Sequence, residues 1–121
     1  MSATQASAVT AILFQLMTAL DNYSLEAAQL GCARVDPKAY HRMRLRLDEM
    51  RRYAHDVPGL SASSVELLIR HFELAHVRWK IDQSGEDCGS LQRAAAEHGA
   101  AVQRLRAQCG ALLRRDASPD G

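Results

Sequence analysis

Apolar residues recur every three or four positions along most of the chain, in four segments separated by short polar stretches or by glycine and proline. This spacing predicts α-helices, because residues three and four apart lie on one face of a helix. The predicted helices span residues 5–30, 37–55, 63–82 and 90–115, and we expect a frayed tail after the last one. The sequence therefore predicts an all-α protein.

Local signals indicate where these helices begin and whether they are continuous. Asp36 and Pro37 are typical of an N-cap and a first helical residue. Ser63 and Glu66 have the spacing of a capping box at the start of the third helix. Polar residues interrupt the first segment at positions 21–24, and we expect one continuous helix through them.

Helices of this length, joined by short connections, pack as sequential antiparallel neighbours. The 121 residues suffice for one such core and are too few for two independent domains. We therefore expect a single domain over residues 1–121, folded as an antiparallel up-down-up-down four-helix bundle.

The composition excludes several classes of protein. A formal charge of +1 gives no overall field that would attract nucleic acid or anionic lipid. We expect neither a secretory signal nor a membrane span, because no long uninterrupted apolar run occurs. Cys32, Cys88 and Cys109 lack the CxxC spacing of a zinc ribbon and are too few for a disulfide framework. These features favour a cytoplasmic protein with reduced thiols.

The third predicted helix is apolar on two faces. The main stripe, which we expect to face the core, consists of Val65, Leu68, Ile69, Phe72, Ala75, His76 and Trp79. The opposite stripe consists of Leu67, Leu74, Val77 and Ile81. Exposure of this whole stripe to water would lose several kcal/mol of the free energy gained by burying apolar side chains. We therefore expect the second stripe to be an interface with another copy of the chain or another protein. The alternative is a central helix that the first helix and the N-terminal arm cover.

Two histidines could meet in the core of the predicted bundle. His76 and His98 lie on apolar stripes of consecutive helices, at similar distances from the turn that joins them. Facing histidines can hold a metal ion or haem. No carboxylate accompanies them in these stripes, and the simpler interpretation is two neutral, hydrogen-bonded core histidines. We therefore predict no metal and no cofactor.

The second predicted helix is the richest in arginine. Arg42, Arg46 and Arg52 are candidates for electrostatic docking of an acidic partner. Nucleic-acid binding is the less favoured interpretation, because the arginines are spread around the helix and no aromatic residues interleave with them.

No motif predicts an enzyme, since a glycine-rich phosphate loop, a GxSxG elbow and paired carboxylates on one face are all missing from the sequence. We predict a small cytoplasmic module for protein–protein interaction, such as an adaptor, chaperone-like or regulatory protein. Self-association as a homodimer through the third helix is expected. Metal or haem binding in the bundle core and nucleic-acid binding are the alternatives.

Overall fold

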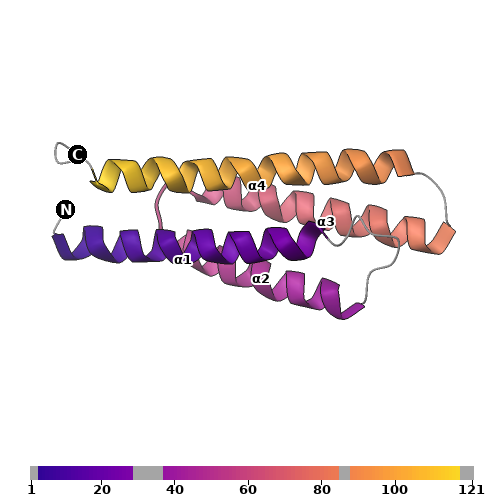
Figure 1. The fold of residues 1–121 in the computed structure, drawn as a ribbon, viewed down its shortest axis with the longest axis horizontal. Helices are drawn as coiled ribbons and strands as arrows, with labels where there is room; N and C mark the ends of the chain where they lie inside the picture. The colour runs from indigo at the N-terminus through magenta and orange to yellow at the C-terminus, as the bar shows by residue number, and fades with distance from the viewer. Residues whose placement is uncertain (1–2, 29–36, 85–87, 118–121) are drawn as a thin grey trace.

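The computed structural model is a four-helix bundle, and it describes residues 3–28, 37–84 and 88–117. The helices are α1 (Ala3–Ala28), α2 (Pro37–His55), α3 (Ser61–Ser84) and α4 (Cys88–Ala117). No strand occurs within these ranges, and each helix runs opposite to the one before it (Figure 1). None of the described helices is long and apolar enough to cross a bilayer. The predicted all-α bundle is confirmed.

The continuity of α1 follows from hydrogen bonds within the helix. The hydroxyl of Ser24 donates to the carbonyl oxygen of Leu20 at 2.9 Å, and that of Thr18 donates to the carbonyl of Phe14 at 3.0 Å. A serine or threonine can bond in this way to the carbonyl four residues back without ending the helix. As predicted, α1 continues through residues 21–24.

The connection between α2 and α3 is short and well defined. α2 begins at Pro37 as predicted, while the expected N-cap, Asp36, lies outside the described residues. After α2, the chain reverses over residues 56–60, where Gly59 has a φ of +92°. This left-handed conformation is open to glycine at little cost.

The predicted capping box at the start of α3 is wrong. The helix begins at Ser61, two residues before the expected cap. Ser63 instead donates a hydrogen bond to Oε1 of Gln108 at 2.6 Å, and Glu66 forms an ion pair with Arg104. Both side chains therefore join α3 to α4.

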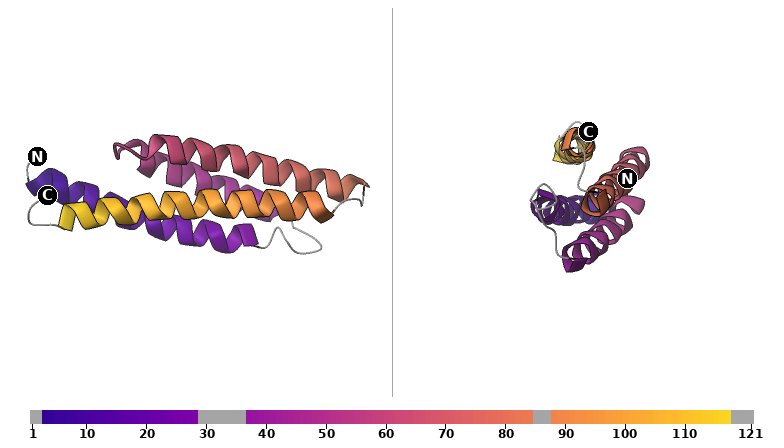
Figure 2. Two further views of the ribbon diagram at one scale, coloured as in Figure 1. Left: turned by 90° about the horizontal axis from the view of Figure 1, so that it is seen from above. Right: turned by 90° about the vertical axis from the view of Figure 1, so that its right-hand side faces the viewer.

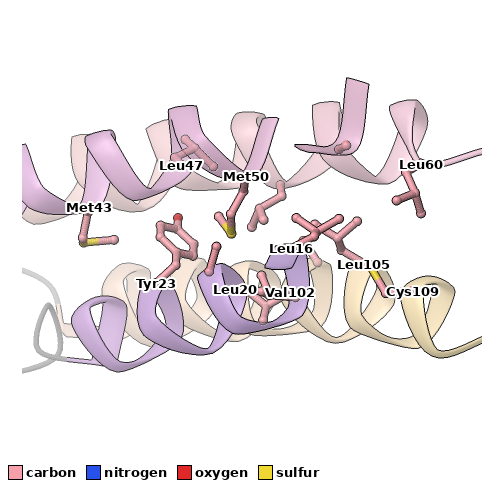
Figure 3. Packing of buried hydrophobic residues seen from close by; sticks show 14 of the residues in the cluster. Leu16, Leu20, Tyr23, Met43, Leu47, Met50, Leu60, Val102, Leu105 and Cys109 are labelled. Atoms are coloured by element: carbon pink, nitrogen blue, oxygen red, sulfur yellow. The ribbon is translucent and has the colours of Figure 1, made fainter. Parts of the chain in front are cut away.

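Viewed along their length, the helices form a ring in chain order (Figure 2). α3 packs most extensively with α4 and α1 with α2, whereas α2 and α3 share the smallest of the four contacts around the ring. Buried side chains fill the centre, including Leu16, Leu20, Tyr23, Met43, Leu47, Met50, Val102, Leu105 and Cys109 (Figure 3). Leu67 and Leu74 of α3 belong to the same cluster. The bundle is thus less closed between α2 and α3 than elsewhere.

α3 turns towards the core the face that the sequence assigned to a partner. Leu67 and Leu74 are buried in the central cluster, Val77 packs against it partly buried, and Ile81 is half-buried. The prediction that these four residues form an exposed interface is therefore wrong. The structure therefore buries the face that was expected outside. This face fits between α2 and α4, where its buried histidine and arginine have polar partners.

Candidate interaction surface on α3

The outward face of α3 carries a row of exposed, largely apolar side chains. This row, which we call the outer stripe, consists of Val65, Ile69, Phe72, His76 and Trp79. Its four apolar members are between 47% and 58% exposed. The sequence placed them in the core, and that prediction is wrong. A contiguous apolar surface of this kind is typical of a site that another protein covers.

The outer stripe has the spacing of a coiled-coil seam. From Val65 to Trp79 its members are separated alternately by four and three residues, which is the a and d pattern of a heptad repeat. This spacing keeps the row along one side of the helix. A single partner helix can therefore reach all five side chains.

α2 borders the outer stripe on one side. Leu45 of α2 is 54% exposed and, together with Val65, lines a hollow of about 920 Å³ between α2 and α3. The charged residues that line this hollow are Asp48, Arg51, Arg52 and Asp56. Beside it, the guanidinium of Arg44 lies 4.9 Å from the ring centre of Phe72, in cation–π range. Arginines thus outnumber carboxylates on this flank.

α4 borders the outer stripe on the other side, where ion pairs join it to α3. Glu66 pairs with Arg104 of α4. Arg70 lies 2.9 Å from the carboxylates of both Glu73 on its own helix and Glu97 on α4. In these ion pairs, three carboxylates share two arginines.

The arginines predicted to dock a partner occupy different environments. Arg42 and Arg46 both pair with Glu26 of α1, at 3.4 and 3.5 Å. Arg52 is exposed and lines the hollow beside the outer stripe. Of the three predicted docking residues, only Arg52 thus lies next to the candidate surface.

The predicted pairing of His76 with His98 is wrong. His98 is buried, whereas His76 lies exposed on the outer stripe with its ring stacked 6.2 Å from that of Trp79. The histidine that shares the core with His98 is His71. His76 lies five positions after His71, an offset of about 140° around a helix, so the two side chains point in different directions.

Tyr23 of α1 joins the two buried histidines. Its hydroxyl oxygen lies 2.8 Å from Nδ1 of His71 on α3 and 2.7 Å from Nε2 of His98 on α4. A hydroxyl has one hydrogen, so it donates to one imidazole and accepts an N–H from the other. This network satisfies three buried polar groups and links three helices.

Burial keeps the network uncharged at neutral pH. Burial, with a smaller effect from the neighbouring His98, lowers the pKa of His71 to about 4. Burial also lowers the pKa of His98 to about 4 and raises the pKa of the Tyr23 hydroxyl. Each shift disfavours the charged form, as expected for groups removed from water.

Neutral imidazoles and a phenol oxygen can ligate transition metals, so Tyr23, His71 and His98 are the residues best suited to hold one. In the structure these atoms bond to one another. Within the described ranges, no three histidine, cysteine or acidic side chains gather as a metal-binding group. Cys109 lies in the core as a free thiol, where burial raises its pKa to about 11.

Sequence reasoning missed the outer stripe as a surface and His71 as a core residue. The alternate spacing by four and three was visible in the sequence, but it was interpreted as the core face of α3. The same spacing relates Leu67, His71, Leu74 and Arg78, which form the buried face. The signal present in the sequence is that two rows of residues on this helix share the same alternate spacing, so either row can face the core.

No protein-family model, curated protein or solved structure matches the chain. The functional interpretation therefore depends on the chemistry and geometry of the outer stripe. Its exposure, its heptad spacing and the ion pairs and charged side chains on its flanks are the properties that a function must explain.

Proposed function

We propose that the chain is a small helical module for protein–protein interaction that self-associates through the outer stripe of α3. In this role it would serve as an adaptor, chaperone-like or regulatory protein of the cytoplasm. The observation that carries the proposal is the heptad row of half-exposed side chains. A helix in a monomeric bundle needs one apolar face, and α3 has two.

The outer stripe supplies a driving force for association. Complete burial of a large apolar side chain is worth about 1.5–3 kcal/mol. Because roughly half of each apolar side chain in the stripe is already covered, about 1 kcal/mol remains to be gained at each position. The side chains lie in one row, so packing against a single helix would bury all of them.

A second copy of the chain fits the outer stripe in both spacing and charge. A heptad seam pairs with a helix of the same spacing, and another α3 provides one. If two copies lie with their α3 helices parallel, the α2 flank of each faces the α4 flank of the other. Arg44, Arg51 and Arg52 then face the side on which Glu73 and Glu97 lie. An antiparallel pair would bring like flanks together, so charge favours the parallel arrangement.

Sedimentation velocity of two matched glutamate variants tests this proposal. We expect the wild-type chain to form dimers and Phe72→Glu to be monomeric, because the new carboxylate would lie inside the seam. Phe14→Glu is the control, since Phe14 is 59% exposed on α1 and lies outside the outer stripe. Both variants should retain the helical circular dichroism of the wild type.

Two results would refute the proposal. A wild-type chain that sediments as a monomer at all concentrations excludes self-association. A dimer that survives Phe72→Glu but dissociates with Phe14→Glu places the contact on α1 rather than on the outer stripe.

A further inference from the structure

The only histidine of the outer stripe occupies its fourth position. His76 is exposed and lies between Phe72 and Trp79 in the row, stacked on the indole ring with 21° between the ring planes. In heptad terms it is a polar residue at an a position, where a partner helix would enclose it. No hydrogen bond or ion pair joins it to another residue in the described part of the chain.

We infer that His76 makes the pairing of outer stripes sensitive to pH, so that copies associate at neutral pH and separate in mild acid. This inference rests on the proposed function, because it concerns the same surface. A neutral imidazole can be enclosed at modest cost, whereas an imidazolium in an apolar seam needs a compensating negative charge. The separated chain therefore takes up protons that the dimer excludes, and acid shifts the equilibrium towards monomers.

The charged groups around this position do not supply that compensation. On α3 itself, Glu73 and Lys80 lie within four residues of His76 and carry opposite charges. Glu73 is engaged by Arg70, which also holds Glu97 of α4. From α2, the guanidinium of Arg44 lies over the ring of Phe72 and disfavours a second cation on the stripe.

The core histidines leave a pH range in which such a switch can act. Burial holds the pKa values of His71 and His98 at about 4. Above that pH the network around Tyr23 stays neutral. The bundle itself loses part of its stability over this range, because the unfolded chain takes up protons on these histidines.

The dimer dissociation constant at two pH values tests the inference. If the dimer excludes the imidazolium, each histidine weakens pairing about tenfold from pH 7.5 to pH 5.5, and the two copies of His76 weaken it about 100-fold. Sedimentation equilibrium at constant ionic strength measures this change. Circular dichroism at both pH values verifies that the chain remains folded.

Histidine-to-glutamine variants identify the residue responsible. His76→Gln keeps a neutral polar side chain and should remove the pH dependence. His41→Gln is the control at another exposed histidine, and it should retain the 100-fold change. His76→Leu should pair at least as tightly as the wild type at both pH values.

The outcomes separate this inference from the proposed function. A wild-type dimer with the same dissociation constant at both pH values overturns the inference alone. A pH dependence that persists in His76→Gln also overturns it and leaves self-association intact. A wild-type chain that is monomeric at pH 7.5 overturns both.

Discussion

The two faces of α3 have similar patterns and opposite environments. The inner face, formed by Leu67, His71, Leu74 and Arg78, repeats at intervals of four and three residues, as does the outer stripe. The inner face includes a histidine and an arginine, whereas the exposed outer stripe includes a phenylalanine and a tryptophan. The less apolar face is therefore the buried one. Apolar content alone does not decide which side of a helix faces the core.

Polar partners account for this outcome. An unsatisfied buried polar group costs about 1–3 kcal/mol. On the inner face, His71 is bonded to Tyr23, and Arg78 lies 3.3 Å from the carboxylate of Asp82. These partners accompany the burial of the mixed face, and the apolar row remains exposed.

The largest contrast between the two faces should come from glutamate substitutions. We expect Leu74→Glu to unfold the bundle, because it would place a charge among buried side chains without a partner. Ile69→Glu on the outer stripe should leave the bundle folded and disrupt only pairing. Circular dichroism and thermal unfolding measure both effects. Equal loss of helix in the two variants would show that both faces are structural.

The free energy of unfolding should depend on pH through the two buried histidines. The unfolded chain takes up protons on its histidines near pH ~6.5, but the folded core resists protonation of His71 and His98 until about pH 4. Stability is therefore fully present above pH ~6.5 and falls as the pH drops towards 4, by roughly 2 kcal/mol per buried histidine at pH 5.

Urea denaturation of the monomeric Phe72→Glu variant at pH 7.5 and pH 5 measures this loss without a contribution from pairing. His98→Phe and His71→Phe should each reduce the loss. A free energy of unfolding that is constant between the two pH values would show that these histidines are not neutral groups buried in the core.

Removal of one hydroxyl should have a smaller effect on the same network. Tyr23→Phe leaves both imidazoles without the oxygen to which they bond. We expect a loss of about 1–3 kcal/mol in the free energy of unfolding. Tyr53→Phe is the control, because the Tyr53 hydroxyl makes a long 3.4 Å bond to Glu49 and is only part-buried. A neutral result for Tyr23→Phe would indicate that the network contributes little to stability.

The smallest effect concerns the border of the outer stripe. Arg44→Ala removes the guanidinium over Phe72 and the exposed pair with Asp48 at 3.3 Å. Contacts of this kind are worth about 0.5–1 kcal/mol at an exposed site. We expect little change in unfolding and a few-fold weaker dimer, measured by sedimentation equilibrium. A larger change in unfolding than in pairing would assign Arg44 to the bundle alone.

Much of the fold was predictable from the sequence. Helical periodicity and the Pro37 start predicted four helices with bounds close to those observed. In α1, α2 and α4 the buried residues, such as Leu20, Met50 and Leu105, recur at helical spacing. These helices each have one dominant apolar face, so their rotation in the bundle is determined by the pattern.

The orientation of α3 and the core network were not predictable in the same way. Two rows on α3 have the same spacing, so the sequence of this helix alone does not determine which row faces the core. The choice depends on the neighbouring helices. The contact of Tyr23 with His71 and His98 depends on the rotation of three helices at once, across 48 and 75 residues of chain. The wrong choice of face for α3 then moved His76 into the predicted core and His71 out of it.

Trp79 is the only tryptophan of the chain and lies on the outer stripe, 58% exposed in the single chain. Its fluorescence therefore reports directly whether a second copy covers this face. We predict that its emission shifts to shorter wavelength and that acrylamide quenches it less as the protein concentration rises at pH 7.5. An emission spectrum that stays that of a water-exposed indole at every concentration would contradict the account.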